Sequence, residues 1–175
     1  MEILKYPIGR FDPPQNIDKN DRSQWIGILE ELPGKLKTCV LDWTEQQFDT
    51  PYREGAWTVR QLVHHIADSH MNSLTRFKWG MTEDTPTIKT YREADWAELP
   101  DALQLHPSVS MVLLEQIHIR LVTLLKGLQD DDFERMIVHP EMGVKMSLHS
   151  LLAMYAWHSE HHLAQIEQLK RQKKW

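Results

Sequence analysis

The sequence predicts an all-α protein: a four-helix bundle with an extended N-terminal arm, a long loop between the second and third helices, and a short hairpin as one interpretation of the stretch before the last helix. Two observations carry this prediction. Apolar residues recur at spacings of three and four along four segments, near residues 18–42, 58–79, 108–128 and 147–169. Each segment has one apolar face, and four such faces are buried most simply against one another.

The N-terminal part of the chain changes character twice. Residues 6–14 hold three prolines and one glycine, which excludes a helix, so we expect an extended arm lying on the domain. The first helix follows over residues 18–42. Pro33 removes one backbone donor and Gly34 follows it, which predicts a kink within this helix and not its end.

The second helix begins with a capping box, in which Thr58 caps the N-terminus and Gln61 reaches back to it, and it extends to about Trp79. His64 falls on its solvent side and His70 within its apolar face. A polar stripe borders that face, and it forms either the rim of the bundle or the lining of a cavity: His65, Ser69, Asn72 and Arg76. The candidates for a substrate pocket are three residues of this stripe and one of the last helix: Ser69, Asn72, Arg76 and Tyr155.

Two long connections follow, one after the second helix and one after the third. Residues 82–107 form an irregular stretch with three prolines, and a loop of this length in a compact domain is usually functional or disordered. Its aromatic residues Tyr91 and Trp96 favour a packed lid or an interface over disorder. Residues 133–146 contain a turn at 139–143 that can join two short extended pieces.

The last helix carries the strongest chemical signal. His158 and His162 are four residues apart, so both imidazoles project from one face, whereas His161 points to the outer side. Two imidazoles at this spacing can bind one metal ion, although histidines on a half-buried face are also ordinary hydrogen-bonded core residues. His65 of the second helix would complete a three-histidine site with an open position; the alternative is an ordinary polar network within the bundle.

Length and composition fit one globular domain over residues 1–175. The net charge of −5 argues against nucleic acid or an anionic membrane as partner. No apolar run approaches the length of a membrane span, and the N-terminus lacks the apolar core of a signal peptide. The single cysteine, Cys39, excludes an internal disulfide and lies on an apolar helix stripe, so we interpret it as a packing residue. With no export signal, the cytoplasm is the expected location.

Four parts of the chain share the pattern of one known family: residues 6–9, residues 49–72, the loop residues Tyr91, Glu93 and Trp96, and residues 157–162. They resemble the YfiT branch of the DinB-like superfamily, and the resemblance covers nearly the whole chain. It implies a bundle of unusual connectivity, usually a homodimer, in which three histidines hold one divalent metal ion: His65, His158 and His162. One departure is Glu160, which stands where the family has a histidine-rich run. Glu160 points outward on the helical wheel, so we expect neither a ligand nor a base there.

The resemblance implies two enzyme activities that share one physical basis. A cation held by three neutral ligands lowers the pKa of whatever binds its open position. Bound water then gives hydrolysis, and the family is commonly labelled metal-dependent hydrolase. A bound small thiol, bacillithiol or a similar one, would become a thiolate and give S-transfer, as in some relatives. A third alternative is a non-catalytic metal-binding dimerisation module, closed by a further protein ligand: His70, Asp68 or a residue of the long loop.

The sequence leaves the reaction on its small-molecule substrate open. Hydrolysis usually uses a general base beside the metal, yet no carboxylate lies on the ligand face of the last helix, which favours thiol activation. Against thiol activation, the sequence offers no obvious anchor for the thiol beyond Asn72 and Arg76 of the polar stripe, so hydrolysis remains the first expectation and S-transfer its rival. Three imidazoles suit Zn²⁺, Ni²⁺, Cu²⁺ or Fe²⁺, and we expect zinc or nickel.

Overall fold

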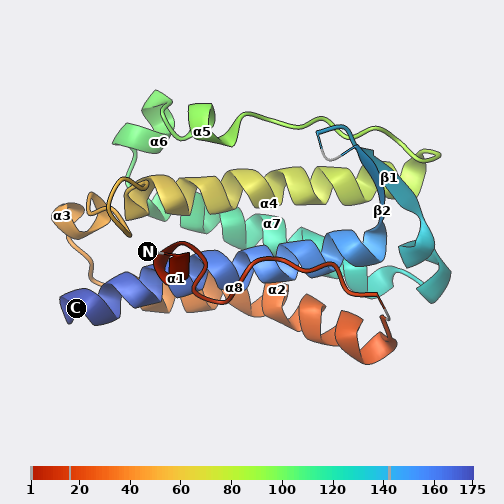
Figure 1. The fold of residues 1–175 in the computed structure, drawn as a ribbon, viewed down its shortest axis with the longest axis horizontal. Coiled ribbons are helices and arrows are strands. Elements are labelled where there is room, and N and C mark those ends of the chain that lie inside the picture. Colours follow the sequence, from red (N-terminus) through yellow and green to blue (C-terminus); the bar gives the residue numbers. More distant parts are fainter. Residues whose placement is uncertain (1, 16, 142) are drawn as a thin grey trace.

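The computed structural model describes residues 2–15, 17–141 and 143–175, and four long helices form its body. These are α2 (Lys19–Cys39), α4 (Val59–Thr82), α7 (Ser108–Gly127) and α8 (Leu148–Lys173). Helix α2 packs against α7 and α8, and α4 packs against the same two helices from the opposite side. Helices α2 and α8 run in one direction and α4 and α7 in the other (Figure 1). The predicted four-helix bundle is confirmed.

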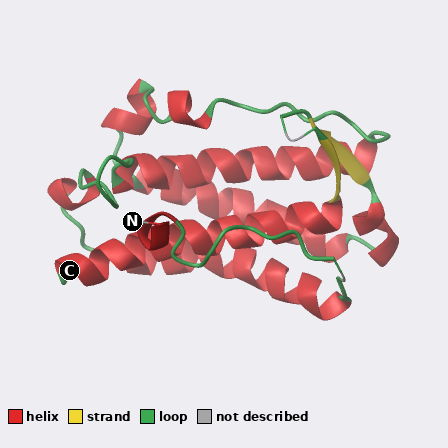
Figure 2. Cartoon of the chain, in the orientation of Figure 1, coloured by secondary structure: helices red, strands yellow, loops and turns green. Residues whose placement is uncertain are grey.

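Short elements connect the long helices (Figure 2). The described part of the chain contains α1 (Glu2–Lys5), α3 (Glu45–Phe48), α5 (Glu93–Trp96), α6 (Pro100–Gln104) and the 3₁₀ helix η1 (Asp130–Glu134). The hairpin interpretation is confirmed: β1 (Met136–His139) pairs antiparallel with β2 (Val144–Ser147). Met142, part of the predicted turn, lies outside the described residues.

The long loop follows from the helix directions. Because α4 and α7 are parallel neighbours, the chain between them must return along the length of the bundle (Figure 1). It is held at both ends, since the Ile88 N–H donates to the Val138 carbonyl (3.0 Å) and Gln61 Nε2 donates to the Ala97 carbonyl (2.9 Å). The stretch is less irregular than predicted, because α5 and α6 lie within it; helices of four or five residues are too short to show a periodic pattern.

The helix ends are set locally. Thr58 Oγ1 accepts from the Gln61 N–H (3.2 Å) and Gln61 Oε1 accepts from the Thr58 N–H (3.0 Å), which confirms the predicted capping box. Asp18 caps α2 in the same way. Helix α2 continues through Pro33, as predicted. These caps satisfy backbone donors that have no partner within the helix.

The core consists of two apolar halves, one towards each end of the bundle. One half includes Leu29, Phe77 and Leu152, and the other includes Leu36, Leu62 and Ile166. Between them lies a layer of buried polar side chains contributed by three of the four helices: His70, Ser73, His118, Ser159 and His162. Burying polar groups is unfavourable unless they have partners, so this layer is the place to look for chemistry.

Two predictions about histidine orientation are wrong. His64 was expected on the solvent side, but it is buried, and its ring contacts Ser110 Oγ (2.7 Å) and the Leu105 carbonyl (3.1 Å). His161 was expected to point outward, but the N-terminal arm covers it: it stacks on Trp157 and lies 5.7 Å from the ring of Tyr6. A helical wheel treats one helix alone, and here distant segments cover both outer faces.

Helix α7 meets the length and composition of a membrane span, contrary to the expectation that no apolar run approaches that length. Its buried residues Leu114 and Leu121 pack in the bundle, as those of a core helix do.

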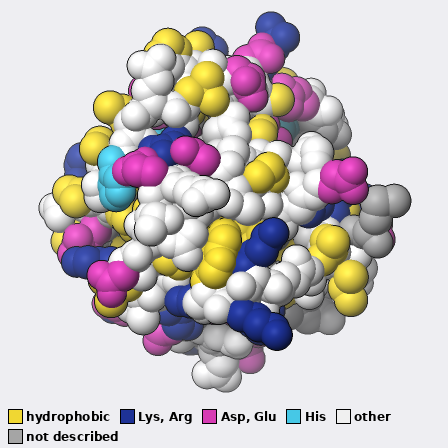
Figure 3. Space-filling view, turned by 90° about the vertical axis from the view of Figure 1, so that its left-hand side faces the viewer, with side chains coloured by type: hydrophobic (Ala, Val, Ile, Leu, Met, Phe, Trp, Pro, Cys, Tyr) yellow, Lys and Arg dark blue, Asp and Glu magenta, His cyan; other side chains and the backbone are white. Residues whose placement is uncertain are grey.

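Cys39 is buried, and burial raises the pKa of its thiol, in keeping with a packing role. At the end of the molecule where α3 and the C-terminus lie, Lys and Arg side chains are interspersed with Asp and Glu (Figure 3).

Candidate metal centre

Three imidazoles from two antiparallel helices meet within the bundle. His158 Nε2 lies 3.3 Å from His65 Nε2 and 3.1 Å from His162 Nε2. All three ligand atoms lie within 4.8 Å of one another. Zinc binds imidazole nitrogen at 2.0–2.1 Å, so two ligands of a tetrahedral ion are about 3.3–3.4 Å apart. The two measured separations therefore fit nitrogen atoms that share one small cation.

Burial keeps these three rings neutral. It lowers the pKa of His65 to about 4, and it lowers the pKa values of His158 and His162 well below the ordinary value. A neutral imidazole offers a free lone pair, whereas an imidazolium offers none. Near neutral pH the cluster therefore presents three uncharged nitrogen donors, which is the chemistry that a divalent metal requires.

The ring orientation of His162 is fixed by a chain of contacts that ends on the N-terminal arm. Gln165 Nε2 donates to the Lys5 carbonyl (2.9 Å), which identifies its other amide atom as the acceptor Oε1. That oxygen lies 2.8 Å from His162 Nδ1, so His162 must donate from Nδ1. In the neutral ring the hydrogen is then absent from Nε2, the atom that faces the other two histidines.

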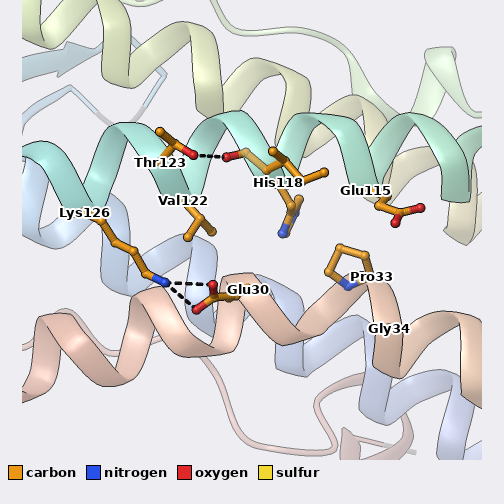
Figure 4. A pocket seen from close by; sticks show the side chains of 9 residues that line it. Glu30, Pro33, Gly34, Glu115, His118, Val122, Thr123 and Lys126 are labelled. Carbon is orange, nitrogen blue, oxygen red and sulfur yellow. Dashed lines mark hydrogen bonds and ion pairs between the residues drawn. The ribbon is translucent and has the colours of Figure 1, made fainter.

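A second chain leads from His158 through the polar layer to helix α2. His158 Nδ1 lies 3.4 Å from His70 Nε2, and His70 Nδ1 lies 2.9 Å from His118 Nε2. The remaining nitrogen of His118, Nδ1, contacts the Leu29 carbonyl. Pro33 stands four residues after Leu29 and has no N–H, so this carbonyl lacks its helical partner and is available to a side chain. Figure 4 shows His118 pointing from α7 towards α2, beside Pro33.

The direction of each hydrogen bond in this chain follows from its end. A carbonyl only accepts, so His118 Nδ1 carries hydrogen and its Nε2 accepts. His70 must then donate from Nδ1 and accept at Nε2, provided that both rings are neutral. Burial supports this, because it lowers the pKa of His118 to about 4 and that of His70 well below the ordinary value. His158 therefore donates from Nδ1, and its Nε2 lone pair is free for a metal.

A cavity of about 570 Å³ adjoins the histidine cluster. His158 lies in its wall, together with Ser69 and Arg76 of α4, Tyr155 of α8 and Glu93 of the returning loop. The hairpin closes another side with Glu141. Tyr91 and Trp96, predicted to pack as a lid or an interface, contact each other with ring centroids 4.6 Å apart, and Tyr91 lines the cavity. The space is large enough for a small molecule beside His158.

Three of the four predicted pocket residues line this cavity: Ser69, Arg76 and Tyr155. Asn72 does not, because its side-chain amide donates to the Asp68 carbonyl within its own helix (2.9 Å). Glu160 is exposed on the outer face of α8, as expected. A second cavity of about 360 Å³ lies between α2 and α7, and it contacts His118 but none of the three clustered histidines (Figure 4).

Sequence reasoning missed several residues of this region. Glu93 was noted only as part of a resemblance, yet it lies in the same cavity wall as His158. Burial, together with the nearby charge of Glu141, raises the pKa of Glu93. Gln165 and His118 show no local pattern in the sequence that links them to the distant residues they contact. The missing N–H of Pro33 was the one available signal for a side-chain contact with α2.

The family model of the DinB superfamily matches residues 28–166. The chain belongs to the DinB superfamily. The chain is 48% identical to YfiT of Bacillus subtilis (strain 168), which is named as a metal-dependent hydrolase. The alignment spans 172 residues and covers 98% of this chain and 97% of that protein. This chain is 47% identical to a protein of Bacillus cereus (strain 03BB102) that is named for the same hydrolase activity, and each chain is covered fully.

Two solved structures share this fold. That of Bacillus subtilis YfiT, described as a metal-dependent hydrolase with an unusual four-helix bundle topology, superposes with a TM-score of 0.96 over 99% of both chains. A mycothiol-dependent maleylpyruvate isomerase superposes with a TM-score of 0.61 at 18% identity, over 80% of this chain and 60% of that one. This second likeness concerns the fold alone. The metal that the family implies fits the residues present, because three neutral nitrogen donors converge at the spacing of one cation.

Proposed function

We propose that this DinB protein is a metal-dependent hydrolase of a small molecule, with His65, His158 and His162 as the ligands of one divalent ion. The observation that carries the proposal is the convergence of three Nε2 atoms beside a cavity that one of them, His158, also lines. When bound, such an ion lowers the pKa of water towards neutrality and polarises the bond to be broken. The names of the relatives support the same reaction class.

Glu93 is the residue to which we assign proton transfer. No carboxylate lies on the ligand face of the last helix, whereas Glu93 of the returning loop lines the cavity beside His158. Its raised pKa brings it closer to the range in which a carboxylate exchanges protons effectively near neutral pH. In this role Glu93 takes the proton of the attacking water and returns it to the leaving group, so the reaction consumes one water and leaves the protein unchanged.

A matched pair of variants tests this assignment. Glu93→Gln should lower kcat about 10²–10⁴-fold, the usual contribution of a general base, while metal content stays the same. Glu160→Gln removes the same charge from the exposed outer face of α8 and should leave kcat unchanged. Hydrolysis of activated esters and amides by the zinc-loaded protein provides the assay. Equal activity of the Glu93 variant and the wild type would contradict the role given to Glu93.

Thiol S-transfer is the second candidate. The cavity beside His158 has room for a small thiol, and a thiol activated by a metal needs no separate base because it binds as the thiolate. Incubation of the zinc-loaded protein with a small thiol and chlorobimane separates the two reactions. Thiol conjugation that is lost in His158→Ala, without ester hydrolysis, would replace the hydrolase proposal. The non-catalytic alternative needs a fourth protein ligand. His70 is already engaged with His118 and His158, which speaks against His70 in that role.

Further expectations belong to the same proposal. Zinc or nickel is the proposed metal, since three imidazoles suit both. A homodimer is proposed as the assembly, and a line of exposed apolar residues on α7 offers a surface for a second copy: Val109, Val112 and Ile119. Neither nucleic acid nor membrane is proposed as a partner, and the cytoplasm is the proposed location. Light scattering of the purified protein measures the assembly directly.

A further inference from the structure

Arg76 is a buried cation that forms no ion pair with the described residues. Its side chain is 6% exposed and lies in the wall of the cavity beside His158. Its Nη1 donates to the Tyr155 hydroxyl (2.9 Å) and its Nη2 to the Lys89 carbonyl (3.4 Å), both neutral acceptors. Its Nε has no acceptor among the described residues. A guanidinium can donate five hydrogen bonds, so these contacts leave donors unmatched, and the charge of Arg76 acts on Glu93 only from beyond ion-pair distance.

The other buried arginines of this fold are treated differently. Arg22 pairs with Asp130, and Arg60 pairs with Asp49 and Glu45. No described carboxylate lies within ion-pair distance of Arg76, although Glu93 and Glu141 share its cavity. Leaving a buried charge unpaired is costly, so a guanidinium with free donors in a cavity wall is suited to an anion that arrives from outside.

From this contrast we infer that Arg76 binds a carboxylate group of the substrate. The inference rests on the proposed function, because it names the substrate class of the same cavity. A single guanidinium matches a single negative charge, and its planar fork suits the two oxygens of a carboxylate. A doubly charged phosphate would be less suited to this cavity, because the carboxylates of Glu93 and Glu141 lie in the same wall.

The position of the cation also orients the substrate. Arg76 and His65 lie on the same helix, eleven residues apart, and Arg76 donates to Tyr155, which precedes His158 by three residues on α8. A carboxylate held at Arg76 therefore leaves the remainder of the molecule to extend along the cavity towards His158. The substrate class is a small carboxylic acid whose reacting bond lies several bonds away from the carboxylate.

Binding to metal-free protein tests this inference separately from the hydrolase proposal. Benzoate and its neutral counterpart benzamide serve as probes, and NMR titration of protein treated with a chelator measures their dissociation constants without any bond to a metal. Benzoate should bind and benzamide should bind at least about tenfold more weakly, as expected for the loss of a charge-assisted hydrogen bond. Failure of the hydrolase proposal would appear elsewhere, as the absence of bound metal or of ester cleavage.

Substitutions locate the effect. Arg76→Met should weaken benzoate binding at least about tenfold. The matched control is Arg92→Met, which removes the same charge from an exposed residue of the same cavity wall and should change binding less than threefold or so. Arg76→Lys keeps the charge without the planar fork and should give an intermediate affinity, which provides a second variant if the methionine variant does not fold. Glu93→Gln should strengthen benzoate binding, because it removes a like charge.

Four results would overturn the inference, and the first three concern comparisons between probes or variants. They are equal binding of benzoate and benzamide, equal losses in the Arg76 and Arg92 variants, and benzoate binding by folded Arg76→Met with the affinity of the wild type. The absence of benzoate binding by the wild type would overturn it as well.

Discussion

Replacement of His70 by leucine should weaken metal binding without unfolding the protein, because His70 orients a ligand and is not one itself. Its Nε2 accepts from His158 Nδ1, and its Nδ1 donates to His118. Leucine does neither, so the ring of His158 can place hydrogen on Nε2, the atom that faces the metal position. Loss of such a partner typically lowers metal affinity about 10–100-fold, or ~1.4–2.7 kcal/mol.

The same change has a separate effect on stability. It leaves His118 Nε2 buried without a donor, which costs about 1–3 kcal/mol in the free energy of unfolding. His64→Leu is the matched control, because His64 is on the same helix, is also buried, and also has two hydrogen-bond partners. Those partners, Ser110 and the Leu105 carbonyl, have no contact with the histidine cluster. The control should therefore lose similar stability and keep the metal affinity of the wild type.

Competition with a chromogenic zinc chelator measures the dissociation constants of the three proteins, and urea denaturation of the metal-free forms measures their stabilities. Long-range ¹⁵N correlation spectra of the imidazoles report which nitrogen of His158 carries hydrogen; we expect Nδ1 in the metal-free wild type and a mixture in the variant. A folded His70→Leu protein that binds zinc as tightly as the wild type would refute the reasoning. So would an equal loss of affinity in His64→Leu.

Three further predictions follow from the same contacts. Pro33→Ala should stabilise a His118→Leu variant more than it stabilises the wild type. The reason is that alanine supplies an N–H to the Leu29 carbonyl, which has lost its side-chain donor in the His118 variant. Urea denaturation gives the free energies of unfolding for a double-mutant cycle, and additive values would contradict this coupling. Gln165→Leu should lower zinc affinity about 10–100-fold, because His162 loses the acceptor of its Nδ1 hydrogen; chelator competition measures the loss, and an unchanged affinity would exclude the role of Gln165. The metal-free protein should lose stability as the pH falls from about 6.5 to about 4. Burial lowers the pKa of His118 to about 4 in the folded state. Over this pH range the unfolded state therefore binds the proton more strongly than the folded state does. The resulting contribution of His118 to the free energy of unfolding is up to about 3 kcal/mol, is fully present above pH 6.5 and is lost as the pH falls to about 4. Urea denaturation at several pH values should show a shallower dependence in His118→Leu; an identical slope in the two proteins would count against it.

The part of the site that lies on one helix could be predicted from the sequence. The four-residue spacing of His158 and His162 fixes their common face, and the structure places their Nε2 atoms 3.1 Å apart. The choice of His65 over its neighbour His64 came from the angular position of each on the second helix, and the structure brings His65 to the pair. Periodicity determines such relations, because it depends only on helix geometry.

The contacts that support the site could not be predicted in the same way. His161 and His64 were placed outward because a helical wheel does not include the arm and the returning loop that cover them. Glu93 reaches the cavity from a helix of four residues, which leaves no periodic signal. The missing N–H of Pro33 was recognised as a potential kink. Which side chain would use the freed carbonyl depends on the packing of α2 against α7, and the sequence does not specify that packing locally.

Metal stoichiometry tests the central claim most directly. Elemental analysis after zinc loading and gel filtration should give about one zinc per chain for the wild type and strongly reduced zinc for each alanine variant of His65, His158 and His162. X-ray absorption of the wild type should then show about three nitrogen neighbours at 2.0–2.1 Å and at least one exogenous light atom. Unchanged zinc content in the three variants, or a first shell filled by protein ligands alone, would contradict the account.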